Sequence, residues 1–170
     1  MGIKTIIHGF KRLFNRREDE LVYRQSGLER LIEAQERDWQ TALTEIKNGR
    51  KQTHWIWYVF PQLVGLGRSC YSNLYGIRDL NEAEAYLNHP ILGRRLRDIT
   101  SELLKHSDLA ASDIFGELDA MKVKSCMTLF DIVSPNDVFA RVLDTFYGGK
   151  RCEYTLEKVN KYILNNDVII

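Results

Sequence analysis

Residues 53–69, THWIWYVFPQLVGLGRS, contain several side-chain types that could bind a ligand. Tryptophan and tyrosine rings can stack on a planar group, a histidine can exchange a proton near pH 7, and a glutamine amide can recognise polar atoms. Further polar side chains, including Lys122 and Ser125, stand in the largely apolar stretch MKVKSCMTLF. Because burial of an unpaired polar group is costly, we expect these side chains to have partners.

These residue types are typical of a pocket for a small anionic or aromatic ligand, in which rings stack and cations pair with an anion. We expect a cleft walled by residues 54–62 and by a helix at residues 117–132. Taken singly, each residue could instead be ordinary structure, with its polar group bonded to a loop carbonyl or along its own helix. The candidate ligand-binding residues are His54, Trp55, Trp57, Tyr58, Gln62, Arg94, Lys122 and Ser125.

The sequence does not predict an activated nucleophile. Ser125 lies in no nucleophile elbow, and neither Ser125 nor Cys126 has a neighbouring base in the sequence. His54 is a weak catalytic candidate, because its imidazole titrates near neutral pH. An enzyme acting on a nucleotide-like or sugar-phosphate substrate is therefore an alternative to a ligand-binding protein.

Composition indicates a soluble globular protein of ordinary size. The chain has 170 residues, of which 44% are hydrophobic and 28% charged, and its formal net charge is +1. So small a charge gives no field to attract nucleic acid. The cysteines and histidines are too scattered to predict a metal site, and we expect no cofactor. Without an apolar run of membrane-spanning length or a secretion signal, we expect a cytoplasmic protein.

The first 24 residues are predicted to be a separate extension. Residues 1–17 contain five lysines and arginines and no acid, and apolar side chains recur at helical spacing at Ile3, Ile7, Phe10 and Phe14. This pattern predicts a basic amphipathic helix, which we expect to pack on the main domain. The alternative is that this helix docks on a membrane surface or on a protein, which would make the chain a protein-interaction module.

Residues 25–170 are predicted to form a single compact all-α domain of about seven helices with short loops. Asn81 with Glu84 is expected to open one helix, and a run starting at Asn136 is expected to form another. Leu118 and Met121 are placed on the apolar face of the helix at 117–133. No second strand is predicted that could pair with residues 54–60, so that segment is expected to be helical. Gly65, Gly67 and Gly93 are expected to lie in loops that let the backbone approach a ligand closely.

The run GRKQTHWIWYVFPQLVGLGRS resembles the signature of a mostly bacterial family, domain of unknown function 1810. That signature is a basic pair, then His-Trp-x-Trp-Tyr-x-Phe-Pro-Gln, then Gly-Leu-Gly-x-Ser. The stretches HPILGRRL, IFG, MKVKSCMTLF and FYGGKRCEYTL follow in the family's order, so the match covers about residues 26–160. The resemblance implies a mainly helical fold and no established activity.

One position departs from the family's pattern. Cys152 stands where an aspartate usually precedes the threonine, here Thr155, by three residues. Genome records sometimes label members of the family calpastatin, which is a disordered inhibitor built from repeats. This chain has neither the disordered composition nor the repeats, and we set that label aside.

Overall fold

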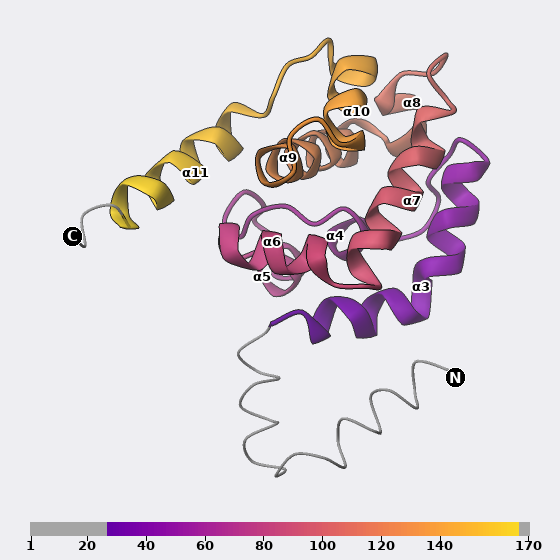
Figure 1. Ribbon diagram of the computed structural model, residues 1–170. Coiled ribbons are helices and arrows are strands. Elements are labelled where there is room, and N and C mark those ends of the chain that lie inside the picture. The colour runs from indigo at the N-terminus through magenta and orange to yellow at the C-terminus, as the bar shows by residue number, and fades with distance from the viewer. Residues whose placement is uncertain (1–26, 167–170) are drawn as a thin grey trace, which may run out of the picture.

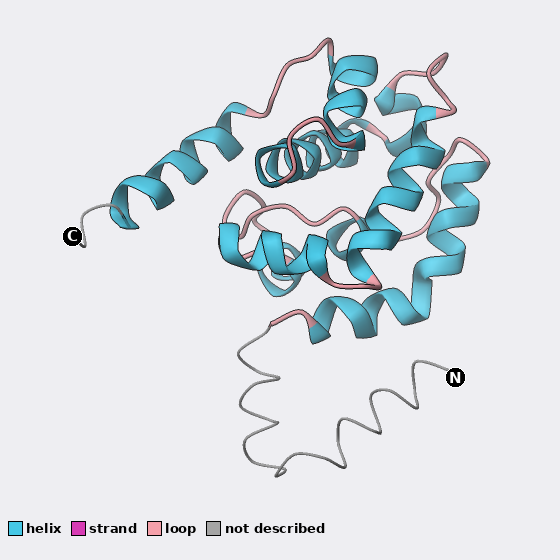
Figure 2. Ribbon diagram, viewed as in Figure 1, coloured by secondary structure: helices cyan, strands magenta, loops and turns pink. Residues whose placement is uncertain are grey.

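Residues 27–166, the part of the chain that the computed structural model describes, form nine helices joined by loops and no strand (Figure 1, Figure 2). The predicted all-α fold is confirmed, with two more helices than the seven expected. The predicted N-terminal helix lies outside the described residues. The helices are α3 (Glu29–Lys47), α4 (Ile56–Val59), α5 (Cys70–Tyr75), α6 (Leu80–Asn88), α7 (Leu92–Leu104), α8 (Ala111–Phe115), α9 (Glu117–Val133), α10 (Val138–Tyr147) and α11 (Glu153–Asn166).

The start of α6 differs from the prediction by a few residues. The Asp79 carboxylate accepts the backbone N–H of Glu82 at 2.8 Å, and it therefore caps a helix that begins at Leu80. The prediction that this helix begins at Asn81 was wrong, because the side chain of Asp79 takes the capping position.

The start of α10 differs in a similar way. Asn136 has a positive φ of 62°, outside the helical region, and the helix begins at Val138 with Asp137 as its cap. The two helices that the sequence did not predict, α5 and α8, have only six and five residues. Helices this short show too few turns for a hydrophobic period to be recognised.

Helix α9 is the central element of the core and contacts α4, α6, α8, α10 and α11. Its Phe130 ring lies 5.2 Å from the ring of Tyr86 in α6 and 5.7 Å from that of Phe139 in α10. All three side chains are fully buried. The aromatic cluster joins α6, α9 and α10 and fixes the helix that carries Lys122 and Ser125.

The apolar face expected for α9 is wrong at its first turns. Leu118 and Met121 are 76% and 63% exposed, because the first turns of α9 lie at the surface and bury only Ala120 before Val123. Gly93 also differs from its expected loop position. It lies in α7, where a Cβ atom would collide with the Leu87 carbonyl of α6. The lack of a side chain at Gly93 therefore lets α6 and α7 pack closely.

A short parallel bridge pairs Leu63 with Ile77. The Val64 N–H donates to the Ile77 carbonyl at 2.9 Å, and the Ile77 N–H donates to the Gln62 carbonyl at 2.8 Å. This pair closes the ends of a loop that carries three glycines and α5. The sequence did not predict a pairing partner for this region, which forms its bridge just after Pro61.

Across residues 27–166, no helix is both long and apolar enough to cross a membrane.

Candidate functional site

The first tryptophan of the WIW motif is part of the core. Trp55 is 1% exposed, and its indole N–H donates to the Glu45 carboxylate at 2.8 Å. The same carboxylate accepts the backbone N–H groups of Gln52 and Thr53 and the Thr53 hydroxyl. Glu45 therefore fixes the turn that leads from α3 into the aromatic segment.

The second tryptophan has a different environment. The Trp57 ring lies 4.9 Å from the ring of Tyr71, which is 50% exposed, and the Lys122 ammonium lies 5.2 Å from the Trp57 ring centre. We call Trp57, Tyr71 and Lys122 the Trp57 platform. The indole nitrogen of Trp57 is buried and has no hydrogen-bond partner among residues 27–166. An unpaired buried N–H is unfavourable, so this donor favours an acceptor that residues 27–166 do not supply.

A lysine–aspartate–lysine cluster holds the cation of the platform in place. Asp119 pairs with Lys51 at 2.8 Å and with Lys122 at 2.9 Å. The Lys51 side chain is only 8% exposed, and its ammonium lies 5.3 Å from the ring centre of Trp55. Two positive charges share one negative charge, which leaves the cluster with a surplus of +1. Burial raises the pKa of Asp119, but Lys51 and Lys122 outweigh burial and hold the pKa below its ordinary value.

The Tyr58 hydroxyl is bonded to groups outside the platform. It hydrogen-bonds the Asp38 carboxylate of α3 and lies 3.2 Å from the His54 carbonyl oxygen. Burial, followed by the hydrogen bond to Asp38, raises the pKa of Tyr58, so the phenol stays protonated at neutral pH. The His54 side chain is exposed.

Gln62 lies beside the glycine-rich loop. Its side-chain nitrogen is 3.2 Å from the place a Cβ atom on Gly67 would occupy, and the same Cβ would collide with Ser72 of α5. Gly67 therefore brings the loop close to the side chains of Gln62 and Ser72, whereas its expected approach to a ligand stays a prediction.

Ser125 faces the start of α11. Its hydroxyl donates to the Cys152 sulfur at 3.2 Å and accepts the Thr155 hydroxyl at 3.2 Å. Cys152 directly precedes α11, and its carbonyl oxygen accepts the Leu156 N–H as the first helical bond. Burial raises the pKa of the thiol, but hydrogen bonds from Ser125, Thr155 and backbone N–H groups outweigh burial and lower the pKa. Cys152 occupies the capping position of α11.

Replacing Cys152 with aspartate, the residue usual in the family's pattern, should stabilise the protein. A carboxylate is a better helix cap than a thiol and would accept the same hydroxyl and N–H donors, so Cys152→Asp should add about 1 kcal/mol, or about 2–4 °C in Tm. Cys152→Ala should lower Tm because it removes the acceptor. A calorimetric Tm of Cys152→Asp below that of the wild type would contradict this role of the residue.

The eight candidates from the sequence do not form one cluster. Trp57 and Lys122 are in contact across α4 and α9, whereas Trp55 and Ser125 are buried and bonded to protein groups. Arg94 is exposed on α7, a helix that contacts α3, α6 and α10. Among residues 27–166, no group of histidine, cysteine and acidic side chains is placed to hold a metal ion.

Three residues important for this region were not among the candidates. Glu45 and Asp119 accept the bonds that order the segment, and Tyr71 forms one side of the platform. The spacing of Asp119 and Lys122 by three residues within a helix was an available signal for their ion pair. No sequence signal marks Glu45, because its partners follow the end of α3 in an irregular turn.

Comparison with known proteins identifies the family. A family model described as "Protein of unknown function (DUF1810)" matches residues 25–159, which include the whole WIW segment and α9. The chain belongs to the DUF1810 family. Among solved structures, it is similar to the conserved hypothetical protein Rv1873 from Mycobacterium tuberculosis, whose crystal structure was determined at 1.38 Å. The TM-score is 0.77 at 39% sequence identity, over 78% of this DUF1810 chain and 96% of the mycobacterial one. No curated protein matches the sequence.

Proposed function

We propose that this DUF1810 protein binds a small anionic ligand with a planar aromatic group at the Trp57 platform. The observation that carries the proposal is the buried indole N–H of Trp57, which has no acceptor within residues 27–166. A ligand oxygen or ring nitrogen at this position would supply the missing acceptor.

The charges and rings of the platform support an anionic and aromatic ligand. The Tyr71 ring is half exposed and packs against Trp57, so it offers a planar surface for stacking. Lys122 has three N–H donors, of which one is used by Asp119. The remaining donors and the surplus positive charge of the cluster favour a carboxylate or phosphate on the ligand.

A thermal-shift screen of the full chain against nucleoside monophosphates, aromatic carboxylates and sugar phosphates tests this function. A ligand present at a hundred times its Kd should add about 2.7 kcal/mol, or on the order of 5–10 °C in Tm. Lys122→Met should then weaken the affinity for the hit about tenfold, because it removes a charge-assisted contact. Trp57→Leu should abolish binding of the hit.

Lys124→Met is the matched control for Lys122→Met. Lys124 is on the same helix and also lies over a ring, 6.0 Å from the ring centre of Tyr147, but it has no contact with the platform in the described residues. The control should bind the hit as the wild type does. No shift across the panel, or equal losses in the two lysine variants, would contradict the proposal.

The two alternative functions remain predictions. An enzyme would need a base beside the bound substrate, and His54→Ala would then abolish turnover while the fold survived. A protein-interaction module would depend on the N-terminal extension, so deletion of residues 1–20 would remove its activity. The cytoplasmic location and the bacterial source also remain predictions.

A further inference from the structure

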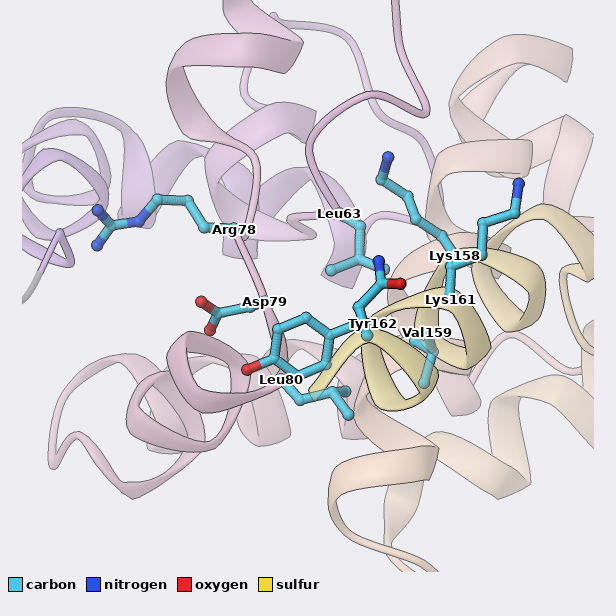
Figure 3. A pocket seen from close by; sticks show the side chains of 9 residues that line it. Leu63, Arg78, Asp79, Leu80, Lys158, Val159, Lys161 and Tyr162 are labelled. Carbon is cyan, nitrogen blue, oxygen red and sulfur yellow. The ribbon is translucent and has the colours of Figure 1, made fainter. Parts of the chain in front are cut away.

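A cavity lies apart from the Trp57 platform, between α11, the start of α6 and the loop that follows Pro61 (Figure 3). Its volume is about 260 Å³, and none of the three platform residues lines it. We call it the α11 pocket. Figure 3 shows Tyr162 of α11 lying across it toward Asp79 and Leu80 of the opposite wall.

One face of α11 lines this pocket with polar side chains. Lys158, Lys161, Tyr162 and Asn165 all border it, at the spacing that places residues on one side of a helix. Lys158 and Lys161 are about one helical turn apart on this face, so both ammonium groups lie at the edge of the α11 pocket. Neither lysine forms one of the salt bridges found within residues 27–166.

The opposite wall adds another cation. Arg78 borders the pocket and pairs with Glu82 at 3.2 Å, but the same carboxylate also binds Arg30 at 2.9 Å. Arg78 is therefore held in an ion-pair cluster with Glu82 and Arg30. The carboxylate in the lining, that of Asp79, is engaged in capping α6. The positive charge that the pocket offers to an anion is therefore that of Lys158 and Lys161.

The loop opposite α11 leaves room for the Lys158 ammonium. Gly65 has a φ of +88°, and a Cβ atom at this position would lie 2.8 Å from the Lys158 nitrogen. The side chain of Lys158 therefore folds over the loop at the edge of the pocket. Because Gly65 combines a positive φ with this close approach, its lack of a side chain is required for the observed position of the ammonium.

The floor of the pocket is apolar and its side wall provides a donor. Leu63 and Val159 are each 4% exposed and form part of the lining. The Tyr162 hydroxyl accepts the Asn81 amide N–H at 3.2 Å, which leaves its own hydrogen available to a ligand oxygen. A cationic rim above an apolar floor suits a ligand with an anionic end and a short apolar body.

We propose that the α11 pocket binds the phosphate group of a small phosphate ester. A phosphate monoester carries nearly two negative charges at neutral pH and three acceptor oxygens, which match the ammonium groups of Lys158 and Lys161. The pocket is smaller than the roughly 300 Å³ at the lower end of pockets for drug-sized ligands. The ester is therefore a small one, with its organic part on Leu63 and Val159.

Titration of the 15N-labelled full chain with inorganic phosphate and with propyl phosphate, at constant ionic strength, tests the proposal. Both should give saturating chemical-shift changes in the amides of residues 78–80 and 158–165. Propyl phosphate should bind more tightly, because its alkyl group covers the apolar floor. Equal affinities would overturn the assignment to an ester, and the absence of saturation with either compound would overturn the site.

Lysine variants test whether the pocket, rather than general surface charge, binds the anion. The double variant Lys158→Gln/Lys161→Gln should weaken propyl phosphate binding about tenfold or more, since it removes two charged donors. Lys47→Gln, at an exposed position of α3, should bind propyl phosphate as the wild type does. All variants should keep the wild-type Tm. Unchanged affinity in the double variant, or an equal loss in Lys47→Gln, would show that the pocket is not the binding site.

Discussion

Glu45→Ala is expected to lower the free energy of unfolding by about 3 kcal/mol, or Tm by about 6–12 °C, because it leaves the buried Trp55 N–H without an acceptor. The substitution also removes the acceptor of two backbone N–H groups in the turn before the aromatic segment. Chemical denaturation followed by circular dichroism measures the loss. Glu36→Ala, on the exposed side of the same helix, should change stability by less than about 0.5 kcal/mol.

The effect of Glu45→Ala should depend on pH. Burial raises the pKa of Glu45, but the hydrogen bonds from residues 52, 53 and 55 outweigh burial and lower the pKa below its ordinary value of 4.5. A lowered pKa in the folded state stabilises the protein above pH 4.5, and this contribution is lost as the pH falls through the folded-state pKa. The stability difference between wild type and variant should therefore shrink in acid. A constant difference, or one no larger than that of Glu36→Ala, would contradict the role given to Glu45.

Asp119→Ala is expected to destabilise the protein by about 2 kcal/mol, because it leaves the nearly buried Lys51 ammonium without its counter-charge. Lys122 would lose the same partner and its fixed position over Trp57. Affinity for a ligand at the Trp57 platform should fall together with stability. Urea denaturation and ligand titration of the same sample measure the two effects.

Glu102→Ala provides the matched control for Asp119→Ala. Glu102 also pairs with a lysine three residues along its helix, Lys105, but that lysine side chain is 66% exposed. Exposed pairs of this kind contribute about 0–1 kcal/mol. The two variants should therefore differ by more than about 1 kcal/mol, and equal losses would show that Asp119 acts as an ordinary surface acid.

Periodicity in the sequence predicted the elements that bury a continuous stripe. The helix expected at residues 117–133 was confirmed as α9. Residues 54–60 were expected to be helical for another reason, the lack of a second strand to pair with them, and residues 56–59 of this segment form α4. The interpretation of residues 54–62 and of the 117–132 helix as two walls of one site placed Trp57 and Lys122 together, and the structure brings these two into contact. Aromatic and polar side chains in an apolar setting were enough to suggest that pair.

Contacts fixed by tertiary structure could not be predicted. Trp55 and Trp57 stand two residues apart and have the same side chain, yet one is bonded within the core and the other faces Tyr71. That difference depends on the turn around Glu45 and on α5, neither of which has a periodic signal. The α11 pocket joins residues that lie about a hundred positions apart in the sequence, so it depends on where α11 packs. Local patterns contain no information on that placement.

The bridge between Leu63 and Ile77 has a consequence for how the family can diversify. The bridge holds the two ends of the loop together, and α5 is tied to the core by the buried Tyr75 side chain and by the hydrogen bonds from Arg30 to the carbonyls of Leu74 and Gly76. Closing a longer loop costs only about 0.6 kcal/mol for each doubling of its length. Insertions at exposed Arg68, ahead of α5, can therefore alter the surface near Tyr71 while the core stays the same. A relative could in this way acquire a different ligand preference on an unchanged scaffold.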